Sequence, residues 1–306
     1  MNVALIFPGQ GAQKVGMGKE FYAASPAAKA IFDAADRILG KDLTNVIFNG
    51  PAEKLTATAY CQPGILTFSL AVLEAFRAHP KFKNVQPKFA AGLSLGEYTA
   101  LAASGALSFE ETLKLVAKRC AYMEEATKLH AGKMAAIIGM EKDKVVEVCR
   151  RTGAEVANFN SPAQIVITGH AAKVEAACEV FRQEGAKSVI PLDVSGAFHS
   201  SLMQPAADKF RVELQRIKLS KPSMSVVPNV NGRPADDPAV ILKNLSNQIT
   251  SSVQWVDTVT NIAKAGVDTF IEIGPGKVLC GLIKRIDRSL RTFNIETPAD
   301  IDNLSI

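Results

Sequence analysis

The sequence predicts an α/β protein with a mostly parallel sheet and a second, smaller sheet inserted into the chain. Two observations lead to this prediction. In the first part of the chain, short apolar stretches typical of buried strands alternate with longer helical segments, as in parallel α/β folds. The middle of the chain has the order strand, helix, strand, strand, helix, strand, which is the ferredoxin-like pattern. The 306 residues are 47% hydrophobic, enough for a substantial core.

The first part of the chain supplies the elements of the parallel sheet. Residues 3–7, Val-Ala-Leu-Ile-Phe, predict a buried strand that runs into a glycine- and glutamine-containing loop at 8–11. Helical stretches are expected at 20–39 and 63–78, and a further helix from 109 to about 127. Each helix follows a strand or a loop, as a sheet covered by helices requires.

The middle of the chain predicts the inserted sheet, and the remainder returns to helices. We expect a ferredoxin-like small subdomain at 128–198 and a large subdomain formed by 1–127 and 199–306. One more apolar strand is expected at 269–273, and the polar tail from Pro298 is expected to be poorly ordered. The elements of the small subdomain are expected at 134–139 (strand), 142–151 (helix), 156–160 (strand), 164–168 (strand), 171–184 (helix) and 188–194 (strand).

Composition excludes several classes of function. The net charge of +5 and the isoelectric point near 8.9 are mild, and no dense Lys/Arg stripe with interleaved aromatics predicts a nucleic-acid partner. No apolar run reaches the roughly 18–20 residues of a membrane span. Five scattered cysteines, none in C-x-x-C, indicate a reducing compartment and no structural metal. The apolar start lacks a basic leader region, so we expect a strand there and not a signal peptide.

The stretch Gly92-Leu93-Ser94-Leu95-Gly96 is the strongest functional motif. This G-x-S-x-G sequence lies between an apolar strand at 88–91 and a helix-like segment at 97–103. A serine on a sharp strand-to-helix turn exposes its hydroxyl, and the N–H groups of the following helix can receive negative charge. Chance occurrence in a turn is the alternative, and the strand–turn–helix context makes it the weaker one. The motif predicts an α/β-hydrolase-like large subdomain with Ser94 as nucleophile.

A nucleophilic serine needs a general base, and His199 is the best placed of four histidines. It follows an apolar strand end and opens a loop, the position of a base on the rim of a sheet. Asp193 would give the hydrolase order Ser…Asp…His, but only if the strand ran unbroken through Gly196. Turns, a linker or a helix cap explain the other three: His79, His130 and His170.

Several motifs occur together and in order along nearly the whole chain. The sequence thereby resembles the malonyl-CoA:acyl-carrier-protein transacylases, the stand-alone acyltransferases of type II fatty-acid synthesis. The combination is far more specific than any single motif. The residues that carry the resemblance are Phe7–Gln13, Gly92–Tyr98, Arg119 with Met123, Asn158–Pro162, Gly196–Ser200 and Glu272–Gly276.

The resemblance implies roles for the catalytic residues. Ser94 is the expected nucleophile and His199 the expected base. In the family a backbone carbonyl orients this histidine, and the matching position is Gln248. Asp193 then becomes an ordinary strand residue.

The resemblance also implies that Gln10 and Leu95 supply the two N–H groups of an oxyanion hole. The residues themselves agree, because Gln10 lies in a glycine-flanked loop at a strand end and Leu95 follows the nucleophile. A phosphate-binding loop is the alternative interpretation of Phe7–Gln13, the segment that contains Gln10. Lys14 stands where G-x-G-x-x-G requires its last glycine, so this alternative fails.

The expected substrate pocket contains Arg119, Met123 and Phe198. From the residues alone Arg119 is a surface arginine; the resemblance makes it the clamp for the free carboxylate of malonate, in a bidentate pair. Phe198 matches the position where malonyl-selective relatives carry Phe, which leaves little room for a methyl branch. Met123 lines the pocket or fills the core. Leu93 replaces a histidine that many relatives have before the nucleophile.

The implied function is transfer of a malonyl group from malonyl-CoA to the phosphopantetheine thiol of acyl carrier protein, through a malonyl-serine ester. No metal or organic cofactor is expected, and no nucleic-acid or membrane partner. The alternatives are an acyltransferase supplying a polyketide synthase, a serine thioesterase or hydrolase, and an idle docking module. The compartment is a bacterial cytoplasm or, for a trimmed plastid form, the stroma. A basic run could steer the acidic carrier or be a solvated helix face: Lys277, Lys284, Arg285, Arg288 and Arg291.

Overall fold

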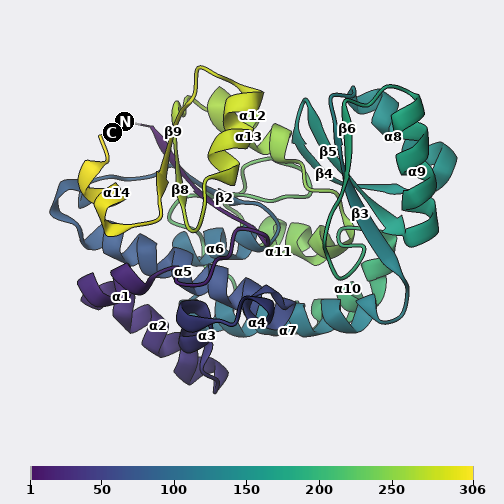
Figure 1. Cartoon of the computed structure of the whole chain (residues 1–306). Helices are drawn as coiled ribbons and strands as arrows, with labels where there is room; N and C mark the ends of the chain where they lie inside the picture. Colours follow the sequence, from purple (N-terminus) through teal and green to yellow (C-terminus); the bar gives the residue numbers. More distant parts are fainter. Residues whose placement is uncertain (1, 306) are drawn as a thin grey trace.

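A computed structural model describes residues 2–305, and a five-stranded parallel sheet forms its centre (Figure 1). The strand order is β7-β2-β1-β8-β9, and all four pairings are parallel. Helices therefore connect the strands, and all the carboxyl ends meet at one edge. The strands are β1 (Val3–Phe7), β2 (Phe89–Gly92), β7 (Ser225–Val227), β8 (Thr269–Ile273) and β9 (Arg291–Ile295).

The central strand β1 divides two apolar cores. Its five residues are all buried, as expected for a strand covered on both faces. Because side chains alternate along a strand, Leu5 packs into one core and Ile6 into the other. The first core includes α5 (Thr58–Ala78), α6 (Leu95–Ala103) and α7 (Phe109–Thr127); the second includes α12 (Trp255–Lys264) and α13 (Val278–Ile286).

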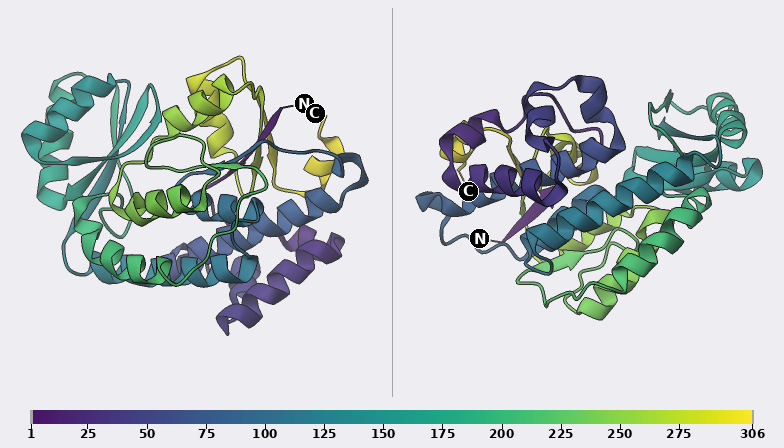
Figure 2. Two further views of the ribbon diagram at one scale, coloured as in Figure 1. Left: turned by 180° about the vertical axis from the view of Figure 1, so that it is seen from behind. Right: turned by 90° about the horizontal axis from the view of Figure 1, so that it is seen from below.

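The other helices of this part pack around the same sheet. Helix α2 runs along α5, and α10 along α7 (Figure 2). The chain ends lie close together at one side of the molecule (Figure 1). These helices are α1 (Lys19–Ala24), α2 (Pro26–Leu39), α3 (Leu43–Asn49), α4 (Ala52–Thr56), α10 (Gln204–Leu214), α11 (Pro238–Asn247) and α14 (Pro298–Asn303), with short 3₁₀ turns at Pro80–Phe82, Ser201–Met203 and Gln248–Thr250.

A separate antiparallel sheet lies beside the first, with α8 and α9 on its outer face (Figure 1). Its order is β4-β5-β3-β6, so β5 lies between β3 and β4, which is the split arrangement of the ferredoxin-like pattern. A third apolar core fills the space between this sheet and its two helices. The elements are β3 (Gly132–Ile138), α8 (Lys142–Thr152), β4 (Glu155–Ser161), β5 (Gln164–His170), α9 (Ala171–Gln183) and β6 (Ser188–Pro191).

The predicted fold class is confirmed: a parallel α/β sheet and an antiparallel sheet inserted into it. The strands of the inserted sheet all lie within 128–198; the exact subdomain boundaries remain predictions. Two edge strands were not predicted from the sequence. The strand β7 has only three residues, and β9 mixes arginine, threonine and asparagine with its apolar residues, so neither gives a periodic apolar pattern.

Two local predictions are wrong. The tail from Pro298 is ordered: Thr297 and Asp300 form a capping box at the start of α14, and Ile301 is buried. Asp193 is not a strand residue, because β6 ends at Pro191 and Asp193 is exposed in the following loop. In both places the apolar pattern was too weak to show where the element ends.

Helix α5 corrects the expectation that no segment is apolar enough to span a membrane. By length and composition alone this helix is apolar enough to span a membrane. However, 78% of the most apolar 18-residue stretch of this helix is buried inside the fold. This burial is typical of the core helix of a globular protein, and the contacts of α5 with α2, α6 and α7 account for its composition.

Two glycines in helices give a direct test of the packing at the Ser94 turn. A Cβ atom on Gly96 would lie 2.1 Å from the carbonyl oxygen of Phe7, whereas one on Gly281 would meet nothing within 4 Å. We expect Gly96→Ala to lower the free energy of unfolding by about 3 kcal/mol or more, because backbone must move. The matched change Gly281→Ala should raise it by about 0.5–1 kcal/mol. Urea unfolding of both variants checks this, and equal effects would contradict the tight strand–helix contact.

Candidate active site

The predicted site residues meet at the carboxyl edge of the parallel sheet. The loop after β1 carries Gln10, and the turn after β2 carries Ser94. His199 comes from the segment between the antiparallel sheet and α10, and Gln248 from the turn after α11. Parallel α/β sheets bind ligands at this edge because the strand ends and the helix N-termini converge there.

Ser94 and His199 share an unusual backbone conformation. Ser94 has φ 55° and ψ −100°, and His199 has φ 57°. Among the described residues they are the only ones other than glycine with positive φ. Such conformations cost about 1–3 kcal/mol each and persist only where the surroundings hold them. At Ser94, the N–H donates to Asn229 Oδ1 (2.7 Å) and the carbonyl accepts from Gln248 Nε2 (2.8 Å).

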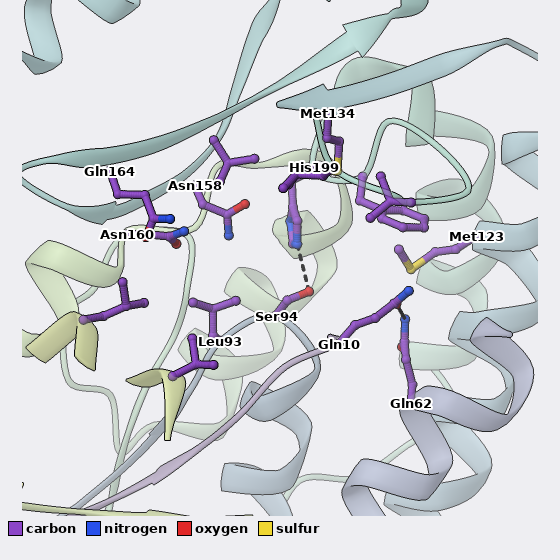
Figure 3. A pocket seen from close by; sticks show the side chains of 16 residues that line it. Gln10, Gln62, Leu93, Ser94, Met123, Met134, Asn158, Asn160, Gln164 and His199 are labelled. Atoms are coloured by element: carbon purple, nitrogen blue, oxygen red, sulfur yellow. Dashed lines mark hydrogen bonds between the residues drawn. The ribbon is translucent and has the colours of Figure 1, made fainter. Parts of the chain in front are cut away.

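The imidazole of His199 points towards the serine (Figure 3), and two carbonyl groups lie on its other side. Its Nε2 is 2.8 Å from Ser94 Oγ, and its Nδ1 is 3.0 Å from the Gln248 carbonyl oxygen and 3.1 Å from that of Ser251. Since carbonyls only accept, the proton belongs on Nδ1, which leaves Nε2 free to accept from the serine hydroxyl. No carboxylate bonds to this imidazole among residues 2–305, and the exposed Asp193 is not its partner.

His199 is held in its neutral form. The side chain is 5% exposed, and burial, with the nearby positive charge of Arg119 as the second cause, lowers its pKa to about 4. The two carbonyl contacts act in the opposite direction but do not outweigh burial. A neutral imidazole at physiological pH is the form that can accept a proton from a hydroxyl or thiol.

Arg119 is completely buried beside the nucleophile. Its Nη1 donates to Gln62 Oε1 (2.6 Å), and its Nη2 to Ser94 Oγ (3.1 Å) and Gln248 Oε1 (3.2 Å). The Nε atom has no acceptor in the described structure, and the guanidinium lies 5.2 Å from the ring centre of Tyr98. Every oxygen it contacts is neutral. A buried guanidinium without a carboxylate partner is costly, so the arrangement favours an anionic ligand.

A cavity of about 250 Å³ opens in front of Ser94 (Figure 3). Both sheets contribute to its walls, and apolar surface dominates. Arg119 is not among the lining residues, but its guanidinium donates to two of them, Gln62 and Ser94. The lining residues are Gln10, Gln62, Leu93, Ser94, Met123, Met134, Asn158, Asn160, Gln164, Val166, Leu192, Val194, Phe198, His199, Val278 and Leu282.

The loop of Gln10 lies against the Ser94 turn. A Cβ atom on Gly9 would lie 2.5 Å from the Leu93 carbonyl oxygen, so only glycine allows this approach. Leu95 is the first residue of α6, and its N–H therefore has no acceptor within the helix. The side chain of Gln10 accepts from Gln62 Nε2 at 3.2 Å (Figure 3). The loop that carries Gln10 and the first turn of α6 thus both adjoin the Ser94 turn.

Sequence reasoning missed two residues of the site. Gln62 lies inside α5, where a glutamine on an apolar helix could have suggested a buried polar contact. Asn229 follows the short strand β7, which the sequence did not indicate. Each contacts residues more than 50 positions away in the chain, so no local pattern reveals them. Among residues 2–305 there is no cluster of His, Cys, Asp and Glu that could hold a metal ion.

Comparison with known proteins identifies the family. The family described as "Acyl transferase domain" matches residues 4–297. A malonyl CoA-acyl carrier protein transacylase of Bacillus subtilis is 45% identical over 306 residues, covering 98% of this chain and 95% of that protein. This chain belongs to the acyl transferase family. A family member of the same name from Staphylococcus aureus is 42% identical over 305 residues, covering 98% and 97%.

Solved structures of the family agree in fold. An acyl-carrier-protein S-malonyltransferase from Burkholderia pseudomallei superimposes with a TM-score of 0.95 at 43% identity, covering 99% of both chains. A malonyl-transacylase solved in complex with its type II PKS acyl-carrier protein has a TM-score of 0.94 at 36% identity, covering 99% of this chain and 98% of that one. The resemblance expected from the motifs is therefore confirmed for the family and the fold.

The lowered pKa of His199 predicts the pH at which the reaction rate of Ser94 falls on the acid side. Labelling of Ser94 by a fluorophosphonate should lose half its rate near pH 4, and not near the ordinary value of 6.5, because only the neutral imidazole accepts the proton. Arg119→Ala removes one cause of the lowering and should move this midpoint to higher pH.

The same shift predicts the pH dependence of stability. The unfolded chain takes up the proton on His199 first, so the stability that comes from keeping this imidazole neutral is lost progressively as the pH falls from about 6.5 towards 4.

Labelling rates of Ser94 from pH 3.5 to 8 check the predicted midpoint near pH 4. Lys118→Ala serves as the control for removing a neighbouring cation. A wild-type midpoint between 6 and 7 would contradict it.

Proposed function

We propose that this chain transfers the malonyl group of malonyl-CoA to the phosphopantetheine thiol of acyl carrier protein and so supplies extender units for fatty-acid synthesis. One observation supports this most directly. The serine and histidine pair lies beside a fully buried arginine that contacts only neutral oxygens, with Nη2 3.1 Å from the Ser94 hydroxyl. Such a site suits an acyl group that carries its own carboxylate.

The first half-reaction begins at Ser94. Its hydroxyl gives a proton to His199 Nε2, and Oγ attacks the thioester carbonyl of malonyl-CoA. The N–H groups of Gln10 and Leu95 stabilise the negative oxygen of the tetrahedral intermediate, each by a few kcal/mol in sites of this type. Collapse of the intermediate breaks the carbon–sulfur bond. The imidazolium of His199 returns its proton to the leaving sulfur, and CoA departs as a thiol.

The second half-reaction repeats these steps with a different thiol. The phosphopantetheine thiol of the carrier gives its proton to His199, and its sulfur attacks the malonyl-serine ester. The proton then returns to Ser94 Oγ as the ester bond breaks. Because a thioester is replaced by a thioester, the exchange is nearly balanced in free energy. None of these steps requires an electron carrier or a Lewis acid, so we propose that no metal or organic cofactor takes part.

Arg119 binds the malonyl carboxylate in this proposal. The carboxylate would replace the neutral oxygen of Gln62, whose side chain lies between the cavity and the guanidinium. A bidentate arginine–carboxylate pair fixes the acyl chain as well as binding it. Phe198 and Met123 line the same cavity, and we propose that the ring of Phe198 excludes acyl groups with a methyl branch.

The orientation of His199 needs no carboxylate. We propose that the Gln248 carbonyl holds the Nδ1 proton, with that of Ser251 as a second acceptor. Carbonyl dipoles orient the ring without adding a full negative charge, which is consistent with the low pKa of this histidine.

A serine thioesterase remains the chemical alternative, because it needs the same serine, histidine and oxyanion groups. It has no use for an unpaired buried arginine beside the nucleophile, so we favour transfer. A polyketide pathway is the other alternative for the destination of the malonyl group; one relative was solved with a type II PKS acyl-carrier protein. The site chemistry is the same for both pathways.

We further propose a reducing compartment, a bacterial cytoplasm or a plastid stroma. All five cysteines are unpaired. For the carrier protein we propose a contact with the basic run near α13, all five residues of which are exposed. This surface continues from Val278, which lines the cavity, so an acidic partner seated there could direct a phosphopantetheine arm inward.

Intact-protein mass after brief mixing with malonyl-CoA tests the covalent step. We expect a malonyl adduct on the protein that moves to holo acyl carrier protein when the carrier is added. Ser94→Ala should show no adduct, because the attacking oxygen is gone. An adduct that persists in Ser94→Ala would disprove the nucleophile, and loss to water at the same rate with and without carrier would favour a thioesterase.

Substitution of Arg119 tests the carboxylate clamp. Arg119→Ala should cost about 1.5–3 kcal/mol in kcat/KM for malonyl transfer, the scale of a charged hydrogen bond, and should spare transfer of an acetyl group. Lys118→Ala removes the neighbouring exposed cation, which pairs with Glu213, and serves as the matched control. Steady-state transfer from malonyl-CoA and acetyl-CoA provides the measurement. Equal losses for both substrates would refute the clamp.

A further inference from the structure

Glu97 is a buried carboxyl group that the mechanism above does not use. It lies in the first turn of α6, three residues after the nucleophile, and is 0% exposed. No lysine or arginine forms an ion pair with it among residues 2–305. Its Oε2 accepts two hydrogen bonds, from the N–H of Asn229 (3.0 Å) and from Gln248 Nε2 (2.9 Å), while Oε1 has no partner. A polar group buried at this depth must be explained by what it holds.

The two partners of Glu97 are the residues that fix the Ser94 turn. Asn229 accepts from the Ser94 N–H (2.7 Å) and donates to the Gly92 carbonyl (2.7 Å), so it bridges both sides of the turn. Gln248 donates to the Ser94 carbonyl (2.8 Å) through its side chain and accepts from His199 Nδ1 through its backbone carbonyl. A single carboxyl oxygen therefore connects the supports of the nucleophile and the base.

Glu97 also determines which way the Gln248 amide faces. An amide can turn its oxygen or its nitrogen towards a neighbour, and the neighbours decide which. The Ser94 carbonyl and Glu97 Oε2 both accept, so the two N–H bonds of the amide point to them. Its oxygen is then left to face the donor Nη2 of Arg119. Without an acceptor at Glu97, one of those N–H bonds is unsatisfied, and only the Ser94 carbonyl and Arg119 Nη2 hold the amide in this orientation.

We infer that Glu97 is a positioning residue for the transfer reaction: its Oε2 holds Asn229 and Gln248 in the places that fix the strained Ser94 turn and the His199 ring. The inference rests on the proposed function, in which Ser94 is the nucleophile and His199 the base. Glu97 touches neither the cavity nor the reacting atoms, and it acts only through these two neighbours.

The feature that matters is the reach of the side chain and not its charge. Burial raises the pKa of Glu97 to about 7, against smaller opposing effects of Asn229, Gln248 and Arg119. The group therefore changes protonation state near neutral pH. In either state Oε2 can accept both hydrogen bonds, because a proton can reside on the unpartnered Oε1.

Two conservative variants separate reach from charge. Glu97→Gln keeps the length and an acceptor oxygen but removes the charge. Glu97→Asp keeps the charge but is one methylene shorter, so it cannot meet both donors. The readout is the rate at which a fluorophosphonate labels Ser94. This probe has no carboxylate, so it reports on the serine and the histidine independently of malonyl binding.

We expect Glu97→Gln to label within a fewfold of wild type and Glu97→Asp to label about 10- to 100-fold more slowly, because a misplacement of about 1 Å at a reacting atom has effects of this size. Glu272→Asp is the matched control. Glu272 is also 0% exposed and accepts two backbone N–H groups, from Leu279 and Cys280, but it contacts none of the residues around Ser94. It should lose stability without a comparable loss of labelling.

The outcomes distinguish this inference from the proposed function. Labelling of folded Glu97→Asp at the wild-type rate would overturn the positioning role. Slowing of Glu97→Gln as large as that of Glu97→Asp would also overturn it, because the length of the side chain alone would then not be enough. Circular dichroism and thermal unfolding establish that each variant is folded. Failure of malonyl transfer in the wild type, with Ser94 still labelled rapidly, would count against the proposed function and leave the Glu97 inference standing.

Discussion

A serine held at φ 55° and ψ −100° is in a region that its side chain disfavours, and the surroundings must hold it there. In this protein the turn between β2 and α6 is held from three directions. Glycines at 92 and 96 allow strand and helix to touch, and the side chains of Asn229 and Gln248 bond to the N–H and carbonyl of Ser94. The hydroxyl is thereby presented to His199 and Arg119 together.

Gln248 connects the separate tasks of the site. Its backbone carbonyl orients His199, its amide nitrogen supports Ser94, and its amide oxygen contacts Arg119. One residue thus links the base, the nucleophile and the group proposed to bind the acyl carboxylate. Because these contacts share one short turn, a shift of that turn would disturb all three at once, which makes its packing between α10 and α11 part of the active site.

The sequence predicted those parts of the structure that have local patterns. The strand at 3–7 is apolar throughout and the one at 269–273 largely so. The G-x-S-x-G turn has a strand before it and a helix after it, so both the fold class and Ser94 could be found. The supports of the site have no such pattern. Asn229, Gln62 and Glu97 acquire meaning only from contacts that span from 52 to 151 positions in the chain. The ordered tail at α14 was missed although its capping box is visible in the sequence.

The cavity walls come from two sheets that the chain joins in only a few places. Val166 and Met134 belong to the antiparallel sheet, while Leu93 lies in the turn after β2 of the parallel sheet and Leu282 in α13. The seam between them includes backbone hydrogen bonds of β4 with Val253, at 2.8 and 2.9 Å. A small rotation of one sheet relative to the other about this seam would widen or narrow the cavity in front of Ser94. Substitutions at the seam would therefore change the fit of a ligand without altering Ser94 or His199, because Asn158, which bridges to Val253, also lines the cavity.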